Sequence, residues 1–151
     1  MTVAYIFINA KIVHIFLSHL KIVFLRLSEI IFVMHIEELR EYCLSLKGAD
    51  ESFPFDDVSL VFKVLNKMFA LIPLDVPELC ICLKCDPEKA IELREKYSCV
   101  EGAYHFHKKY WNCIYLNRKM NDEDVKFWIR HSIDEVMKKL PKQTQSEYYN
   151  S

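Results

Sequence analysis

The stretch VSLVFKVLNKMFALIPL, residues 58–74, decides the fold of this chain. Apolar and other residues alternate from residue 58 to residue 65, and successive side chains of a strand point to opposite faces of a sheet. On one face of this strand lie Val58, Leu60, Phe62 and Val64. Asn66-Lys67 then separates it from a second apolar run, and asparagine tolerates the positive φ angles of a tight turn. The stretch predicts a β-hairpin.

Outward from the hairpin, the pattern predicts further strands and helices. A third strand is expected over residues 79–84, and Asp86-Pro87-Glu88 then supplies a capping side chain, a proline at the first helical position and an acid near the positive helix end. That helix is expected to end near Tyr97. Asn121 opens a second helix, which Pro141 ends.

The remaining segments complete the predicted architecture. Residues 35–47 have helical spacing, residues 49–57 are expected to form an irregular loop, and residues 104–106 and 110–116 are expected to be extended. Helices combined with a hairpin-built sheet favour an α+β fold, a two-layer sandwich of an antiparallel sheet with helices. The polar tail over residues 143–151 is expected to be disordered.

The first 33 residues do not match the rest of the chain. They are strongly apolar, but Lys11 and Lys21 interrupt them, so they are a poor match to the roughly 20 uncharged residues of a spanning helix. Because Met34 precedes an ordinary helix opening, we expect translation to start there and residues 1–33 to be a non-native extension. The alternative is an amphipathic or hydrophobic anchor. No membrane partner is expected unless these residues are native.

The composition excludes several classes of function. The chain has only two glycines, Gly48 and Gly102, so it contains neither a G-x-G-x-x-G motif nor a Walker loop to cradle phosphates. No cysteine is flanked by a signature of an activated nucleophile, and the acid runs are typical of a solvated loop and a helix N-terminus. We therefore expect neither an enzyme nor a cofactor, although a catalytic site without a sequence signature is a third hypothesis.

One region concentrates cationic, amide and aromatic side chains. Between Glu101 and Asp122 the chain has no acidic residue, whereas residues 34–151 together hold 17 basic and 20 acidic residues. The cations would contact phosphates, the aromatic rings would stack and the amide would contact a base edge. The candidate nucleic-acid-binding residues are His105, His107, Lys108, Lys109, Tyr110, Trp111, Asn112, Arg118 and Lys119.

Cysteines and histidines offer weaker signals. Six cysteines lie largely within apolar runs, which favours reduced, buried thiols in a cytoplasmic protein over a disulfide framework. The spacing of Cys80, Cys82 and Cys85 could alternatively indicate a metal site. Because the sequence does not place the fourth ligand that zinc requires, no metal site is expected. His105 and His107 would share a strand face, where protonation would add charge against DNA as pH falls.

The chain resembles the MmcQ/YjbR-like family from about Met34 to Lys142. The matching segments are Ile36–Cys43, Phe53-Pro54-Phe55, Val61–Val64, Met68–Leu71, Leu83–Glu88, Gly102–His105, Lys108–Asn112 and Leu140-Pro141-Lys142. The resemblance implies a CyaY-like fold with a double-wing arrangement and a DNA-binding role. Glu101 stands where members of this family often have proline.

Two functions follow as hypotheses. The first is a small cytoplasmic DNA-binding protein that contacts the phosphate backbone through the segment over residues 104–119. The second is a protein–protein interaction module that does not bind nucleic acid and meets a partner through an apolar or acidic face. Because the chain is mildly acidic as a whole, DNA binding by the first hypothesis must be local and sensitive to salt.

Overall fold

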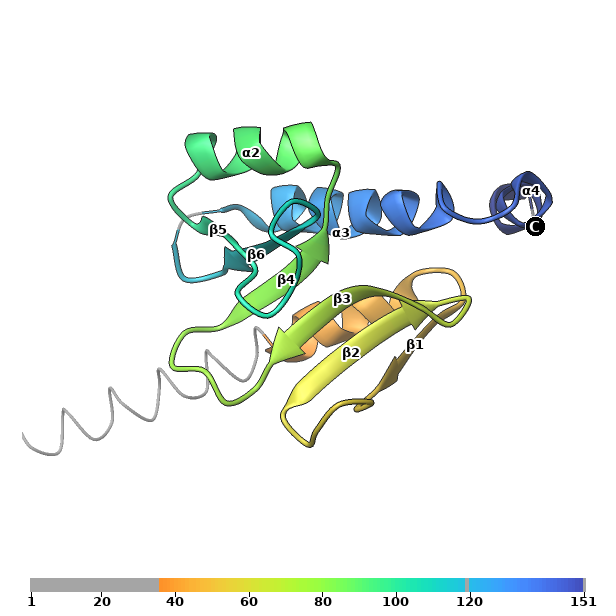
Figure 1. Cartoon of the computed structure of the whole chain (residues 1–151). Helices are drawn as coiled ribbons and strands as arrows, with labels where there is room; N and C mark the ends of the chain where they lie inside the picture. The colour runs from red at the N-terminus through yellow and green to blue at the C-terminus, as the bar shows by residue number, and fades with distance from the viewer. Residues whose placement is uncertain (1–35, 119, 151) are drawn as a thin grey trace, which may run out of the picture. The chain divides into compact units, whose positions relative to one another are not determined.

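The computed structural model describes residues 36–118 and 120–150. Within them, six antiparallel strands form one sheet in the order β1-β2-β3-β4-β6-β5 (Figure 1). The strands are β1 Ala49–Ser52, β2 Ser59–Val64, β3 Lys67–Pro73, β4 Cys80–Lys84, β5 Val100–Gly102 and β6 Trp111–Tyr115. The expected α+β fold with an antiparallel sheet is confirmed, while its CyaY-like and double-wing details stay predictions.

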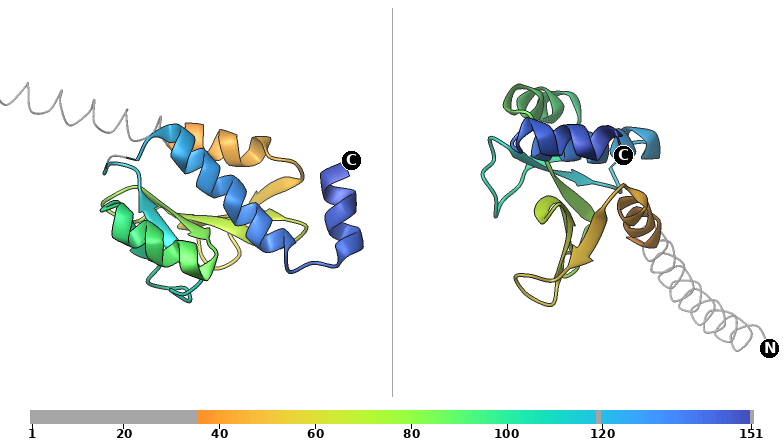
Figure 2. Two further views of the ribbon diagram at one scale, coloured as in Figure 1. Left: turned by 90° about the horizontal axis from the view of Figure 1, so that it is seen from above. Right: turned by 90° about the vertical axis from the view of Figure 1, so that its right-hand side faces the viewer.

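The helices cover residues 36–45, α2 Pro87–Lys96, α3 Asp122–Met137 and α4 Lys142–Asn150. Figure 2 shows α2 and α3 together on one side of the sheet. Asn112 of β6 donates to the Ala90 carbonyl of α2 at 3.1 Å, and Ser132 of α3 accepts from the Lys84 amide of β4 at 2.8 Å. Both helices are thus bonded to the sheet. None of the described helices has the length and apolarity needed to cross a membrane.

The two helix starts expected from sequence are confirmed by their caps. The Asp86 carboxylate accepts from the amides of Glu88 and Lys89, which satisfies backbone groups that the first turn of α2 leaves unpaired. The Asn121 side chain accepts from the Asp124 amide at 2.8 Å and caps α3 in the same way. Local side chains therefore set where both helices begin.

The predicted hairpin forms, with its turn one residue earlier than expected. Leu65 and Asn66 have φ angles of 50° and 59°, and β3 begins at Lys67. A two-residue turn that follows the right-handed twist of the strands requires positive φ at both central positions. Asn66 adopts this conformation readily, and Leu65 adopts it because the register of β2 with β3 leaves no other position for the turn.

Three segments differ from the sequence-based expectations. Residues 49–52 form strand β1, which pairs with β2 from Ala49–Val64 to Ser52–Val61, where an irregular loop was expected. Residues 104–106, expected to be extended, lie in turns, and the strand lies earlier, at β5. The expected disordered tail forms α4 instead, because Tyr148 donates to the Lys47 carbonyl and Tyr149 donates to Asp134.

Each face of the sheet has its own apolar cluster. The largest fully buried side chains come from the sheet, from α3 and from the segment before β4. They are Phe62, Phe69, Ile72, Leu79, Ile81, Ile114, Ile129 and Met137. The opposite face carries a second cluster of Val61, Leu71, Cys80, Cys82, Ala103, Trp111 and Cys113. The loop between β5 and β6 packs Phe106 on the Trp111 ring, with centroids 4.8 Å apart. That loop therefore closes over the second cluster.

Candidate functional site

The predicted binding residues separate into exposed and structural groups. His105, His107, Lys108 and Lys109 are exposed on the loop between β5 and β6, and Tyr110 is half-buried. Trp111 is only 8% exposed and lies under Phe106, so it is not available to stack on a base. Asn112 is 2% exposed and bonds to α2, so it cannot read a base edge. The predictions for Trp111 and Asn112 are wrong.

Arg118 is occupied by carboxylates. Its guanidinium donates to both Glu78 oxygens, at 2.7 and 2.6 Å, and to Glu101 at 2.7 Å, and it stacks on the Tyr115 ring. These bonds raise the pKa of Arg118 and lower that of Glu78. The arginine therefore joins the loops around β4 and β6 and does not present a charge to a ligand. Lys119 lies outside the described residues.

The two histidines do not form a metal chelate in the described part of the chain. His105 packs its ring edge-on against Tyr104, with centroids 4.9 Å apart. The His107 ring packs against the Tyr110 ring, and the His107 Nδ1 accepts a hydrogen bond from the Lys109 amide at 3.4 Å. Neither residue lies in a group of three metal-capable side chains. Both imidazoles are instead parts of the exposed loop surface.

The structure gathers a different set of cations around the loop between β5 and β6. We call it the basic strip and define it as Lys84, Arg94, Lys108, Lys109 and Lys139. The Lys109 and Lys139 ammonium groups lie 5.4 and 5.2 Å from the centre of the Tyr110 ring, one from the loop and one from beyond α3. The tyrosine therefore joins cations that are 30 positions apart in the sequence.

Lys84 extends the basic strip across the end of β4. Its Nζ lies 5.8 Å from the centre of the Trp111 ring, and its side chain contacts Lys139. Burial lowers the pKa of Lys84, and the neighbouring charge of Lys139 lowers it further. Glu135 partly opposes this shift, but within the described residues no carboxylate lies within ion-pair distance of either lysine. The strip therefore contains two closely spaced ammonium groups, and a bound anion would offset their mutual repulsion.

The other end of the basic strip borders a groove of about 360 Å³. It is lined by Pro87, Glu88, Ile91, Arg94, Lys108 and Lys109. Arg94 fixes the loop against α2 by donating from Nη1 to the Lys108 carbonyl at 2.9 Å. A Cβ on Gly102 would stand 2.9 Å from that Nη1 and 3.3 Å from the Lys108 side chain. The absence of a side chain at Gly102 therefore lets Arg94 and Lys108 pack closely against the backbone of β5.

Sequence reasoning missed Lys84, Arg94 and Lys139, because each belongs to a different part of the chain and all three lie outside the acid-free stretch over residues 102–121. Lys139 follows the C-terminus of α3, where a cation complements the helix dipole. Neighbouring lysines do not share its role, since Lys138 contacts Glu135 instead. The antiparallel pairing of β4 with β6 sets Lys84 opposite Trp111, whereas Arg94 reaches the loop from α2 and Lys139 from beyond α3.

The cysteines also differ from expectation. Cys82 and Cys113 form a disulfide, so the expectation of reduced thiols is wrong for these two residues. The free cysteines Cys43, Cys80, Cys85 and Cys99 are buried, as expected. Burial raises the pKa of each, to about 11 for Cys80 and to about 12 for Cys43 and Cys85. A thiol that keeps its proton is a weak nucleophile.

Comparisons with known proteins place this fold among relatives. The family model YjbR matches residues 44–134. The uncharacterised protein YjbR of Escherichia coli K12 is 29% identical over 110 residues, which cover 73% of this chain and 93% of that protein. The uncharacterised protein YbdF of Escherichia coli O157:H7 is 28% identical over 109 residues, which cover 72% of this chain and 89% of its own length.

Two solved structures share the fold. The crystal structure of protein DR2400 from Deinococcus radiodurans, described by its domain DUF419, has a TM-score of 0.68 and 36% identity, over 75% of this chain and 86% of that one. A crystal structure of a Pseudomonas syringae protein has a TM-score of 0.57 and 23% identity, over 64% and 93% of the two chains. The described fold is therefore one that proteins of known structure adopt.

Proposed function

This chain belongs to the YjbR family, and we propose that it binds the phosphate backbone of nucleic acids through its basic strip, with little preference for base sequence. The observation that carries the proposal is the contact between Lys84 and Lys139. Two ammonium groups brought together repel each other, and half-burial of Lys84 strengthens this repulsion. A phosphate between them would offset the repulsion and favour the charged form of Lys84.

The rest of the basic strip suits a polyanion better than a single small anion. Arg94, Lys108 and Lys109 line a groove that also offers the apolar surface of Ile91 and one carboxylate, that of Glu88. Successive phosphates of one strand would meet successive cations, while Ile91 and Tyr110 would contact sugars. Phosphate contacts of this kind position a protein on nucleic acid without reading its sequence.

Fluorescence anisotropy with labelled duplex and single-stranded DNA tests the proposal. The variant Lys84→Gln/Lys139→Gln should bind several-fold more weakly than wild type at low salt, because two phosphate contacts are lost. The matched control is Lys89→Gln/Lys96→Gln, which removes the same charge from exposed positions of α2 outside the strip. Equal weakening by both variants would mean that only net charge matters and would overturn the assignment of the strip.

A second candidate function is a protein-interaction module. The loop between β1 and β2 exposes two phenylalanines, Phe53 at 49% and Phe55 at 65%, beside Asp56 and Asp57. Exposed aromatic side chains are typical of contact residues at protein interfaces. Phe53→Ser/Phe55→Ser would leave DNA affinity unchanged under the first proposal. If DNA binding is absent in the wild type, this loop becomes the leading candidate surface.

A further inference from the structure

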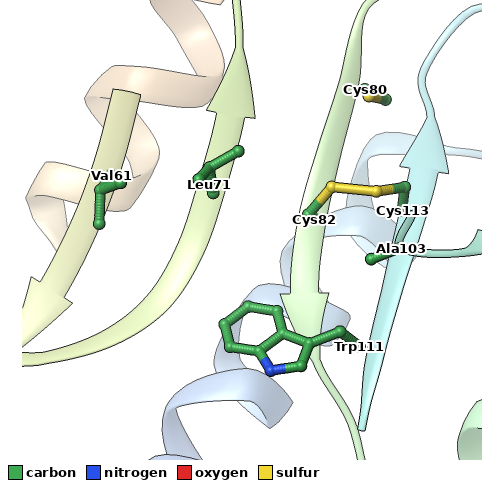
Figure 3. Close-up of a cluster of buried hydrophobic side chains, with 7 residues drawn as sticks. All are labelled: Val61, Leu71, Cys80, Cys82, Ala103, Trp111 and Cys113. Carbon is green, nitrogen blue, oxygen red and sulfur yellow. A yellow bond between two sulfur atoms is a disulfide. The ribbon is translucent and has the colours of Figure 1, made fainter. Parts of the chain in front are cut away.

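Three cysteine sulfurs meet on the face of the sheet opposite α2 and α3 (Figure 3). Cys80 and Cys82 lie two residues apart on β4, so they share a face, and Cys113 on β6 is the register partner of Cys82. Cys82 and Cys113 have Cα atoms 4.0 Å apart and form the disulfide. Cys80 remains a thiol, and all three sulfurs lie within 4.8 Å of one another.

Apolar side chains surround this cluster. Val61 and Leu71 lie beside it on the sheet, and Ala103 and Trp111 border it toward the loop between β5 and β6 (Figure 3). The three cysteines are 4–8% exposed. Among the described residues, no histidine, aspartate or glutamate joins them as a further ligand. The cluster therefore offers three cysteine sulfurs as ligands, with the side chain of Met68 packed against it.

We propose that, after a dithiol reduces the Cys82–Cys113 disulfide, Cys80, Cys82 and Cys113 together bind one soft, thiophilic ion through three sulfur ligands. The reduction transfers two electrons and two protons to the disulfide, and the dithiol becomes a disulfide. In the oxidised protein, two of the three sulfurs are bonded to each other and cannot act as ligands. Occupation of the site is thus conditional on a reducing environment.

The number and type of ligands restrict the ion. Zinc in structural sites takes four tetrahedral ligands, and calcium and magnesium require oxygen. A site made of thiolates, without oxygen or nitrogen ligands, selects soft ions. Among soft ions, this site suits those that are stable with three ligands. Monovalent copper and trivalent arsenic both satisfy this requirement.

Charge favours the trivalent ion. Three thiols react with arsenous acid to form three As–S bonds and three waters, so the bound complex is neutral. Monovalent copper on three thiolates would leave two negative charges among Val61, Leu71 and Trp111, and buried charge is costly. Copper binding must release protons and weaken as pH falls, whereas the arsenite reaction releases none.

Native mass spectrometry of the full-length chain tests the proposal in two oxidation states. Protein reduced with a dithiol and then freed of it should bind one arsenic when incubated with arsenite, and the oxidised protein should bind none. A parallel arm supplies monovalent copper against a competing chelator. Binding of either ion at one per chain, only after reduction, is the expected result. No binding of either ion by the reduced protein would overturn the proposal.

Two variants locate the ligands. Cys80→Ala should lower the affinity by about tenfold or more, since loss of even an outer partner of a metal ligand costs about that much. The matched control is Cys85→Ala, which removes another buried thiol at the end of β4 and should leave binding unchanged. A stronger effect of Cys85→Ala would move the site to the Cys-x-Cys-x-x-Cys segment. The comparison of oxidised with reduced wild type stands even if a variant fails to fold.

Discussion

Arg118 holds Glu78 with two parallel hydrogen bonds, 2.7 Å from Nε to Oε1 and 2.6 Å from Nη2 to Oε2. A third bond, to Glu101, uses Nη1. The guanidinium thus faces carboxylates from the segments before β4 and on β5, which lie 40 and 17 positions away in the sequence. A cation from an acid-free stretch of sequence is therefore paired with carboxylates that the fold brings to it. For this reason, the distribution of charge along the sequence does not by itself locate the binding surface.

The first prediction separates Arg118 from the basic strip. Arg118→Gln should leave the salt dependence of DNA binding unchanged, because this side chain contacts its own carboxylates. Lys109→Gln should reduce the slope of log affinity against log salt by about 0.9, the loss of one phosphate contact. Anisotropy titrations at several salt concentrations measure both. If Arg118→Gln instead reduced the slope of log affinity against log salt, Arg118 would have to be counted among the residues that contact DNA.

The second prediction concerns the bond between α3 and the sheet. Ser132 is fully buried; its hydroxyl donates to the Phe69 carbonyl and accepts from the Lys84 amide. Ser132→Ala leaves both backbone groups without this partner and should lower the free energy of unfolding by about 1–3 kcal/mol. Urea unfolding measures the change. Ser45→Ala, at an exposed hydroxyl, is the control and should have little effect.

The third prediction concerns the disulfide. Cys82 and Cys113 are 31 positions apart, and closing a loop of that length restricts the unfolded chain. Reduction should lower the free energy of unfolding by about 3–4 kcal/mol. Urea unfolding with and without a dithiol measures it, and Cys113→Ala serves as the control because its stability should not respond to the dithiol. An equal response in Cys113→Ala would place the redox sensitivity elsewhere.

The fourth prediction is a pH dependence set by His131. Its Nε2 accepts a hydrogen bond from the Asp86 amide at 3.3 Å, so the folded state needs the neutral ring. Burial lowers the pKa of His131 below 6.5, against the opposing charge of Glu135. The folded state therefore binds the proton more weakly than the unfolded state, and the resulting stability is present above pH 6.5 and lost as pH falls through the folded pKa.

Urea unfolding at several values between pH 7 and pH 5 measures this loss. His131→Gln keeps an acceptor for the Asp86 amide but does not titrate, so it should show a flatter profile. Glu135, Lys89 and Lys138 are present in both proteins, and the difference between the profiles isolates His131. Identical profiles would contradict the assignment.

Much of the fold could be predicted from local patterns. Alternation predicted the β2–β3 hairpin, and the Asp86 and Asn121 caps predicted where α2 and α3 begin. Strand β1 was missed because its sequence, Ala-Asp-Glu-Ser, is polar and its pairing with β2 depends on partners that the sequence places across an intervening loop. Helix α4 was missed because its contacts reach Lys47, 101 positions earlier.

The site was predictable only in part. The exposed cations Lys108 and Lys109 and the aromatic Tyr110 could be found in one acid-free segment. The burial of Trp111 and Asn112 could not, since strand alternation leaves open which face a loop or a helix will cover. Lys84 and Lys139 join the site through tertiary pairing, and the Cys82–Cys113 disulfide depends on the register of β4 with β6. Such relationships have no local sequence signal.

The central claim is that the basic strip binds a phosphate backbone, and the salt dependence of duplex DNA affinity tests it most directly. If all five cations contact phosphates, the slope of log affinity against log salt should be about −4.5, and Lys84→Gln/Lys139→Gln should reduce it to about −2.7. A slope near zero in the wild type, or one that this variant leaves unchanged, would contradict the claim.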